Sequence, residues 1–258
     1  MSIEQNYERR FGGVKRLYGD QALINFKKSH IIVVGIGGVG SWVVEALARS
    51  GIGKITMIDM DIVSESNINR QLPALSSTIG KDKTKIMMER VKEINPDCDI
   101  TIIDDFLTKD NLNDLLKDSD YIMDCIDNSR VKAALISWCK SNKNKIIVIG
   151  GAGGRIDPSL IKISDLKNTI HDPLLSRTRK ILRQKYNFSS NAKRRFNIPS
   201  VFSTEHIRYL ATDGKISSKK PQKEIGGLSC SGGIGSSVMV TATFGLLATS
   251  HVLKRLSK

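Results

Sequence analysis

Several charged and amide side chains that follow residue 58 have types and spacings that suit phosphate chemistry. The chain carries Asp59, Asp61, Asn67, Arg70, Gln71 and Lys83 in one stretch, and Asp127 with Asn128 further on. A hydride-transferring enzyme needs no such set around its cofactor. An enzyme that cleaves ATP does, because it must neutralise the triphosphate, hold a magnesium ion and stabilise a pentacoordinate phosphorus. The residue types therefore favour ATP chemistry.

A glycine-rich turn precedes these side chains and indicates where a nucleotide would lie. The apolar run 30–34 is typical of a buried strand, and it is followed by Gly35, Gly37, Gly38 and Gly40. A helical pattern comes next, and the strand at 54–59 ends in Asp59, which is placed to accept hydrogen bonds from ribose hydroxyls. Glycines let the backbone N–H groups of the new helix approach a phosphate or a ribose. The alternative is a merely tight strand-to-helix turn, but strand, helix and acid all fall where a nucleotide site needs them.

The polar residues also match a known pattern. The sequence DxDxVxxxNxxRQ, then GxxK, then DCxDN, resembles the ubiquitin-activating-enzyme-like adenylyltransferases, which include MoeB and ThiF and in which a carboxylate attacks the α-phosphate of ATP. Within this superfamily the chain is similar to the branch that dehydrates threonylcarbamoyladenosine in tRNA. The motifs that carry this closer resemblance lie at 10–13 with 17–19, 35–42, 150–154 with 156–158, 201–205 and 240–245.

The resemblance implies a role for each matching residue. The four glycines form the nucleotide turn, Asp59 binds ribose, Lys83 contacts phosphate and ribose, and Asp127 holds magnesium with Asn128 beside it. The residues implied around the phosphates are Asp61, Asn67, Arg70 and Gln71, and the implied catalytic set is Arg70, Lys83 and Asp127. An N-terminal arginine of the family also reaches the phosphates, often from a partner subunit, and Arg10 or Arg16 could take this part. The plainer interpretation makes Arg70 and Lys83 surface ion-pair residues and Asp127 a helix N-cap.

The resemblance further implies substrates and partners. ATP would adenylate the carboxylate of a threonylcarbamoyl group on the adenosine next to a tRNA anticodon, and ring closure would follow. Magnesium, a homodimer, a monovalent cation and a sulfur-relay partner belong to the same expectation. Two alternatives stay open: an activator of a ubiquitin-like sulfur-carrier protein, and a non-catalytic RNA-binding protein that keeps the fold. The four cysteines form no CxxC pair, which counts against the first alternative.

The charge distribution predicts an RNA-facing surface. The net charge is +14, and residues 174–223 hold thirteen Lys or Arg against two acids, which amounts to eleven of the fourteen charges. Such a segment invites a polyanionic partner, and because the rest of the chain is nearly balanced in charge we favour this interpretation over a merely solvated surface. Within it, Arg194 and Arg195 are our candidates for contact with tRNA.

Strands alternating with helices predict an α/β fold with a Rossmann-like, doubly wound, mostly parallel sheet, a C-terminal antiparallel extension and a final helix. We expect strands at 30–34, 54–59, 99–104, 121–125 and 145–150, and helices at 20–27, 82–94, 109–118 and 129–142. Beyond residue 154 we expect antiparallel strands at 160–163 and 200–203, a basic helix at 172–186, and loops at 187–199 and 211–227. The expected organisation is an N-terminal helical arm (1–29), an ATP-binding domain (30–155) and a basic, tRNA-facing extension (156–258).

Residues 226–253 carry no formal charge, and the second half of this stretch, from about residue 235, is expected to be a helix. Two interpretations remain: a membrane segment, or a helix packed on the sheet. Many Gly, Ser and Thr residues weaken the apolar character, which favours the packed helix and leaves peripheral membrane association as the lesser alternative. No signal peptide is evident and the cysteines are few and widely spaced, so we expect a cytoplasmic protein. The sequence leaves the role of Cys230 open.

Overall fold

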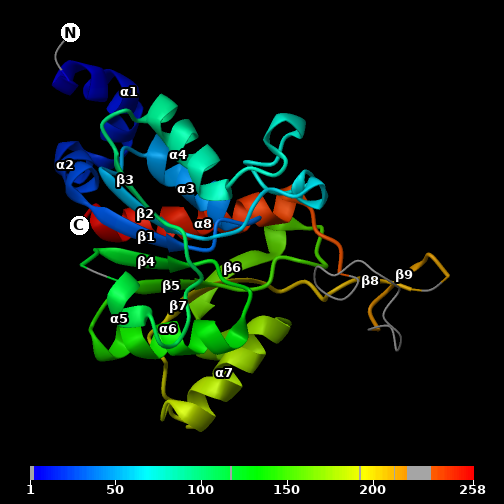
Figure 1. Ribbon diagram of the computed structural model, residues 1–258. Coiled ribbons are helices and arrows are strands. Elements are labelled where there is room, and N and C mark those ends of the chain that lie inside the picture. The colour runs from blue at the N-terminus through cyan, green and yellow to red at the C-terminus, as the bar shows by residue number, and fades with distance from the viewer. Residues whose placement is uncertain (1–2, 117, 192, 212, 220–233) are drawn as a thin grey trace.

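A seven-stranded sheet forms the centre of the molecule, with helices on both faces (Figure 1). The computed structural model describes residues 3–116, 118–191, 193–211, 213–219 and 234–258. The strand order is β3-β2-β1-β4-β5-β7-β6, and only β6 runs antiparallel to its neighbour. The strands are β1 (His30–Val34), β2 (Lys54–Ile58), β3 (Asp99–Ile103), β4 (Tyr121–Asp124), β5 (Ile146–Ile149), β6 (Ile161–Asp165) and β7 (Pro199–Ser203). The Rossmann-like fold class expected from the sequence is confirmed.

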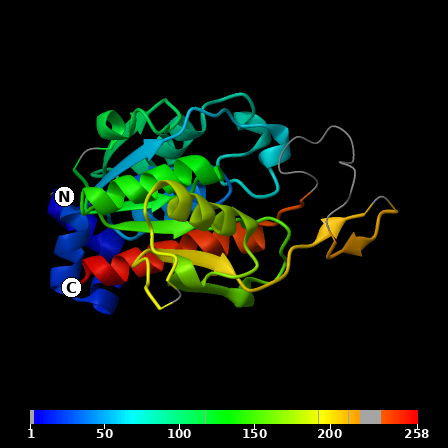
Figure 2. The ribbon, with the colours of Figure 1, turned by 90° about the horizontal axis from the view of Figure 1, so that it is seen from below.

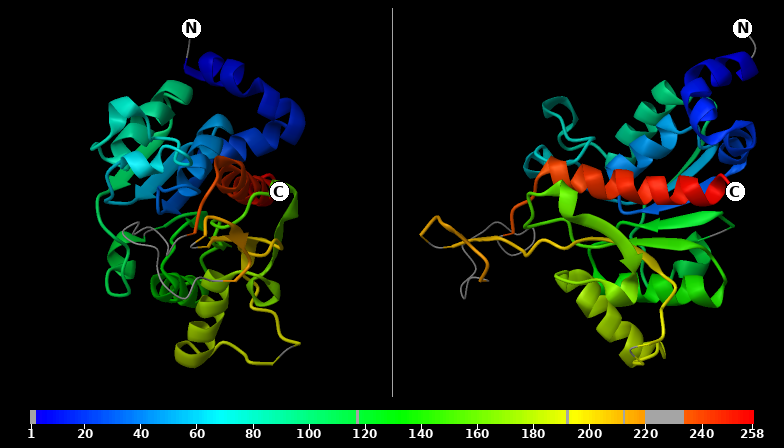
Figure 3. Two further views of the ribbon diagram at one scale, coloured as in Figure 1. Left: turned by 90° about the vertical axis from the view of Figure 1, so that its right-hand side faces the viewer. Right: turned by 180° about the vertical axis from the view of Figure 1, so that it is seen from behind.

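The helices divide between the two faces of the sheet, as Figures 1 and 3 show. One face is covered by α3 (Gly40–Arg49), α4 (Lys83–Ile94) and α8 (Val238–Leu256). The other face is covered by α5 (Leu112–Leu115), α6 (Ser129–Ser141) and α7 (Pro173–Lys185). Short 3-10 helices are η1 (Glu65–Asn67), η2 (Ser76–Thr78), η3 (Pro158–Leu160) and η4 (Leu166–Asn168). Two apolar clusters, one on each face, make a three-layer α/β core.

The strand order reverses at β1, which creates the crevice where such sheets bind ligands. β1 pairs with β2 on one side and with β4 on the other, both in parallel. The chain therefore leaves β1 and β4 in opposite directions across the sheet, which opens a gap at their carboxyl ends. Gly35 follows β1, Asp59 follows β2, and Asp127 lies three residues beyond β4, so all three residues belong to this edge.

The final helix is a core element, as expected. Val240, Phe244, Ala248 and Val252 of α8 are fully buried, and the helix packs on α3. Gly245 sits at the closest point, where a Cβ atom would lie only 2.8 Å from the Val39 carbonyl oxygen. Among the described residues, no helix is both long and apolar enough to cross a membrane.

The N-terminal segment holds one helix more than the sequence indicated. The expected helix is α2 (Asp20–Lys28), and it is preceded by α1 (Ile3–Tyr18), which runs through Gly12 and Gly13. Tyr7 and Phe11 explain why two glycines do not break it: both side chains are buried, and the Tyr7 hydroxyl donates to the Gly51 carbonyl at 2.5 Å. Tertiary packing outweighs the low helix propensity of glycine here.

The two strands expected at 160–163 and 200–203 are β6 and β7, and they pair antiparallel with each other, as expected. β7 also pairs in parallel with β5, which joins this extension to the main sheet. A two-stranded hairpin, β8 (Tyr209–Leu210) with β9 (Ile216–Ser217), projects beyond the carboxyl edge of the sheet (Figures 1 and 2). The expected helix at 109–118 is reduced to the single turn of α5. The expected loop at 211–227 lies partly outside the described residues, and Cys230 lies wholly outside them.

Candidate nucleotide-binding site

The glycine turn after β1 is shaped by two glycines that no other residue can replace without strain. Gly35 has a positive φ of 87°, and a Cβ atom there would lie 3.1 Å from the Cys125 carbonyl oxygen. A Cβ atom on Gly40 would lie 1.8 Å from the Gly35 carbonyl oxygen, which no side chain can accept. The turn therefore fits tightly against the end of β4, two residues before Asp127. Space is ordinary at Gly37 and Gly38, where the nearest atoms belong to Gln71 and Arg70.

Asp59 holds the backbone of this turn in place through hydrogen bonds. Its carboxylate is buried and accepts the backbone N–H of Ile36 at 2.5 Å with one oxygen and that of Asp61 at 2.8 Å with the other. Burial raises the pKa of Asp59, and the two backbone N–H donors and nearby Lys83 oppose that rise. The acid expected to bind ribose thus lies directly beneath the glycine turn and fixes its backbone.

Asp61 and Lys83 form the next part of the site. The Lys83 ammonium is 2.9 Å from an Asp61 carboxylate oxygen, and the lysine side chain is only 5% exposed whereas Asp61 is 52% exposed. Lys83 opens α4, and its backbone N–H donates to the Asp61 carbonyl at 3.2 Å. A nearly buried cation is thereby held at the mouth of the crevice, where an incoming phosphate could compete for it.

The segment from Asn67 to Gln71 lies over the glycine turn. Asn67 is buried, and its amide oxygen accepts the Ser64 N–H at 3.1 Å, which closes the turn of η1. The Arg70 guanidinium donates to the Ser66 carbonyl at 2.7 Å, and its Cγ lies 3.4 Å from the Cβ position of residue 38. Gln71 is buried, and its Oε1 has no hydrogen-bond partner among the described residues. An unsatisfied polar atom beside a glycine turn suits a site built for a ligand.

Asp127 and Asn128 lie on the turn between β4 and α6. Both are exposed. The Asn128 amide oxygen accepts the N–H of Arg130 at 2.9 Å and that of Val131 at 3.3 Å, so Asn128, not Asp127, caps α6. The Asp127 carboxylate has no partner in the part of the chain that the structure describes. That part contains no cluster of three or more His, Cys, Asp or Glu side chains able to hold a metal by themselves.

A buried ion pair beneath this turn was not predicted from the sequence. Asp124 and Lys132 are both fully buried, with Nζ 2.8 Å from Oδ1, and Nζ also donates to the Asp124 carbonyl at 3.2 Å. Burial raises the pKa of Asp124, against the opposing effect of Lys132. One signal was available in the sequence. Lys132 falls on the same face of α6 as Leu135 and Cys139, and apart from Lys132 these residues of the buried face are apolar.

Other predicted residues are not brought to the crevice. Arg194 and Arg195 are exposed on the loop that enters β7 at its amino end, which is the opposite edge of the sheet from the glycine turn. Arg10 donates to the carbonyls of Glu93 (2.9 Å) and Ile94 (3.0 Å) at the end of α4, also away from the site of its own chain.

A glycine turn at the switch point of a doubly wound sheet, with an acid beneath it and a lysine and an arginine at its mouth, defines a Rossmann-like nucleotide-binding protein. More specifically, the chain belongs to the ThiF family, whose model matches residues 7–258. It is 53% identical to a tRNA threonylcarbamoyladenosine dehydratase of Haemophilus influenzae over 260 residues, covering 100% of this chain and 97% of the relative. It is 46% identical to the enzyme of that name from Escherichia coli, covering 98% and 96%. The crystal structure of the E. coli protein in complex with ATP matches with a TM-score of 0.87 and 44% identity, over 99% of this chain and 97% of that one.

Proposed function

We propose that this chain dehydrates threonylcarbamoyladenosine in tRNA next to the anticodon, by using ATP to adenylate its carboxylate. The observation that carries the proposal is the identity of 53% over the full length with an enzyme named for this reaction. The packing of Arg70 and Gln71 over the glycine turn supports it, because the reaction requires an ATP site.

The reaction divides into two steps. The carboxylate of the threonylcarbamoyl group attacks the α-phosphorus of ATP, and pyrophosphate leaves. A carbamoyl oxygen or nitrogen of the same group then attacks the activated acyl carbon, and AMP leaves as the ring closes. The attacking atom is already tethered, and such intramolecular placement can be worth roughly 7–11 kcal/mol. The protein therefore need not supply a covalent nucleophile.

The roles we propose follow the geometry of the crevice. The glycine turn (Gly35, Gly37, Gly38, Gly40) and Asp59 hold the nucleoside side, while Lys83 and Arg70 neutralise the triphosphate and the charge that develops at phosphorus. Lys83 would exchange its Asp61 partner for phosphate, and the Gln71 carboxamide oxygen would find its missing donor on the nucleotide. Asn67 acts by holding the turn that carries Arg70, and Asn128 by fixing the start of α6 next to Asp127.

Magnesium fits this donor set if the nucleotide completes its coordination. Magnesium usually binds one or two carboxylates together with substrate phosphates, and Asp127 is exposed and unengaged at the crevice. Asp127 would hold the ion, which would supply charge neutralisation at the phosphates. A monovalent cation is the further ion we propose to test, by replacing potassium in the assay.

Assembly and partners extend the proposal. We propose a cytoplasmic homodimer in which the arm of one chain, with Arg10 or Arg16, approaches the crevice of the other. The ATP-binding residues 30–155 and the basic residues 156–258 would divide nucleotide and tRNA binding between them, and a sulfur-relay protein is a candidate partner. Light scattering that finds only a 28.5 kDa species at micromolar concentration would count against the dimer.

The experiment that tests the function measures pyrophosphate release from ATP with four additions: tRNA carrying the modified adenosine, unmodified tRNA, a ubiquitin-like sulfur carrier, or nothing. We expect release only with the modified tRNA, together with a product nucleoside lighter by one water. Release with the sulfur carrier alone would favour the alternative activity. Tight NAD binding without ATP binding would exclude adenylation.

A further inference from the structure

A pocket lies at the carboxyl edge of the sheet, close to the ends of β5 and β7. Its volume is about 390 Å³, and its wall includes His171, Ser176, Arg179, His206, Tyr209 and Ser218. The loop 150–154 that supports it follows β5, and β5 neighbours β4, whose following turn carries Asp127. The pocket and the proposed ATP site therefore share one edge of the sheet.

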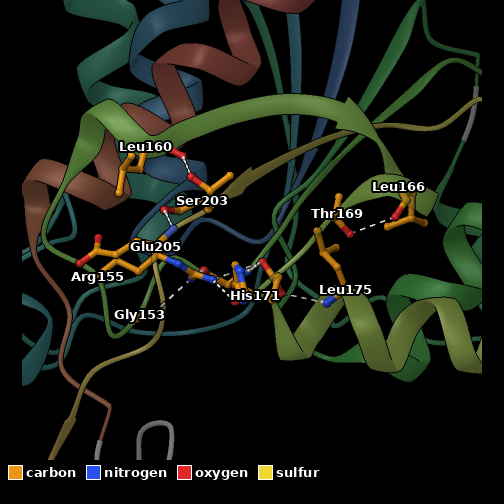
Figure 4. A network of polar contacts seen from close by, with 12 residues as sticks. Gly153, Arg155, Leu160, Leu166, Thr169, His171, Leu175, Ser203 and Glu205 are labelled. Carbon is orange, nitrogen blue, oxygen red and sulfur yellow. Dashed lines mark hydrogen bonds and ion pairs between the residues drawn. The ribbon is translucent and has the colours of Figure 1, made fainter. Parts of the chain in front are cut away.

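A fully buried arginine, Arg155, holds the backbone of the wall residue His171 through the polar network that Figure 4 shows. The Arg155 guanidinium donates to the carbonyls of Gly151 and Gly153, and its other terminal nitrogen donates to the His171 carbonyl at 2.8 Å. The same nitrogen is 3.9 Å from the Asp172 carboxylate, and neither side chain of that pair is exposed. Removing a charge from water is costly, so a buried network of this kind is expected to fix a geometry.

The glycine-rich loop at 150–154 leaves room for the Asp172 carboxylate. A Cβ atom on Gly150 would lie 2.1 Å from the Asp172 Oδ2, and the same oxygen accepts the Gly151 N–H at 3.0 Å. The other carboxylate oxygen accepts the N–H of Leu175 at 2.9 Å and caps α7. The first two glycines of the motif at 150–154 therefore pack on Asp172, a residue of the pocket wall.

Two histidines of the pocket wall, His171 and His206, lie with their rings in contact. Their ring centroids are 3.8 Å apart with an interplanar angle of 46°. His171 has a φ of 53°, a left-handed conformation that non-glycine residues seldom adopt without a local reason. His206 follows Glu205, whose carboxylate accepts the N–H groups of Ile156 and Asp157, both at 3.0 Å. Both rings are thus anchored to the segment that carries Arg155.

The exposed chemistry of the pocket suits a nucleotide. Aromatic rings, including His, stack with unpaired bases in RNA recognition, and arginine is a preferred phosphate ligand. Asp172, the carboxylate among the lining residues, is already engaged by Arg155 and by backbone N–H groups. Arg179 is the lining cation. Its Nη1 donates to the Leu166 carbonyl at 3.3 Å and to the Thr169 hydroxyl, and its other guanidinium nitrogens have no partner among the described residues, so they remain available to a phosphate.

We propose that this pocket binds one nucleotide of the RNA substrate, with its base against the His171–His206 pair and its phosphate at Arg179. This assignment rests on the proposed function, because it takes RNA as the substrate. It places the RNA contact on the same edge of the sheet as the ATP crevice.

The test is steady-state kinetics with ATP and an RNA stem-loop that carries the modified adenosine, for wild type, His206→Ala and His206→Phe. His206 is exposed, so neither change should disturb the fold, which thermal unfolding verifies. We expect the alanine variant to raise the KM for RNA about tenfold, the size expected from loss of one stacking contact, and to leave the KM for ATP unchanged. The phenylalanine variant keeps a ring face and should stay within about threefold of wild type.

A matched control removes a charge outside the pocket. Lys215 is exposed on the neighbouring hairpin, and Lys215→Ala should change the KM for RNA less than threefold. An unchanged KM for RNA in His206→Ala would overturn the proposal, and so would a phenylalanine variant as impaired as the alanine variant, because the pocket would then hold a phosphate without its base. A wild-type protein that binds ATP but shows no RNA-dependent pyrophosphate release would overturn the proposed function itself.

Discussion

Lys132 and Asp124 form an ion pair from which water is excluded, with Nζ 2.8 Å from Oδ1 and neither side chain exposed. The pair joins α6 to the end of β4, immediately before the turn that carries Asp127. It is therefore a structural support of the proposed ATP site, although neither residue reaches the crevice.

Replacing Lys132 with Met should destabilise the protein strongly. The change leaves the Asp124 carboxylate buried without a cation, which typically costs about 3–5 kcal/mol. We expect the Tm to fall on the order of 10 °C, measured by differential scanning calorimetry. Arg130→Met, which removes an exposed cation from the same helix, is the control and should leave the Tm nearly unchanged. A loss of Tm no larger than the control's would mean that the pair contributes little.

Asp127→Asn should abolish turnover without changing stability. The substitution is nearly isosteric, and it removes one negative charge from an exposed carboxylate at the crevice. Loss of such an electrostatic group commonly costs on the order of 10²–10³ in rate. The measurement is kcat at saturating magnesium together with the Tm. Asp114→Asn, an exposed acid on α5, is the matched control, and near-normal turnover of the Asp127 variant would exclude it as the magnesium ligand.

Glu45 should make stability depend on pH in the acid range. Burial tends to raise its pKa, but hydrogen bonds from Arg90 and Arg49 outweigh that and hold the pKa of Glu45 below its usual value. A lowered folded pKa contributes stability above the unfolded value, about 4.3, and that stability is lost as the pH falls through the folded pKa. Both arginines are partly solvent-screened, so Glu45→Gln should cost only about 1–2 kcal/mol at pH 7.

Urea unfolding of wild type and Glu45→Gln between pH 3 and pH 7 checks this prediction. The difference in unfolding free energy should shrink toward zero below the folded pKa of Glu45. Glu65→Gln, an exposed acid of η1, should show no such difference. If the difference in unfolding free energy between wild type and Glu45→Gln stays constant from pH 3 to pH 7, ionised Glu45 does not stabilise the fold.

The double variant Arg194→Ala, Arg195→Ala tests whether RNA also reaches the amino edge of the sheet. Each phosphate neutralised adds about 0.7–0.9 to the log–log salt slope, so the slope should fall by one to two units if both residues touch phosphate. ATP binding should not change, because the glycine turn lies at the opposite edge. Lys254→Ala with Lys258→Ala removes equal charge from the end of α8 as a control. If the salt dependence of tRNA binding does not change in the double variant, Arg194 and Arg195 do not contact RNA and belong to an ordinary solvated surface.

Local patterns were enough to predict the central sheet and the glycine turn. β1, β2 and β5 are short apolar runs, and Asp59 follows its strand directly, so each could be recognised without its neighbours. α1 was missed because Gly12 and Gly13 argue against a helix when Tyr7 and Phe11 have no visible contact. The antiparallel pairing of β6 with β7 was predicted, but the parallel pairing of β7 with β5 was not, because pairing partners are not encoded in a strand's own pattern.

The parts of the site that depend on distant segments could not be predicted. Arg155 meets Gly151, His171 and Asp172 only in the folded chain, and nothing in its neighbours reveals that it is buried. Arg194 and Arg195 were selected by charge density, which does not tell at which edge of the sheet a loop lies. Lys132 alone offered a clue, as a lysine on an apolar helix face.

The packing of α8 on α3 has a consequence for substitutions that are far from the glycine turn in sequence. A Cβ atom on Gly245 would lie 2.8 Å from the Val39 carbonyl oxygen and 3.0 Å from the Trp42 Cβ, so a larger residue at position 245 would force α8 away from the start of α3. Because α3 begins where the glycine turn ends, such a change in the final helix would shift the backbone that faces the nucleotide.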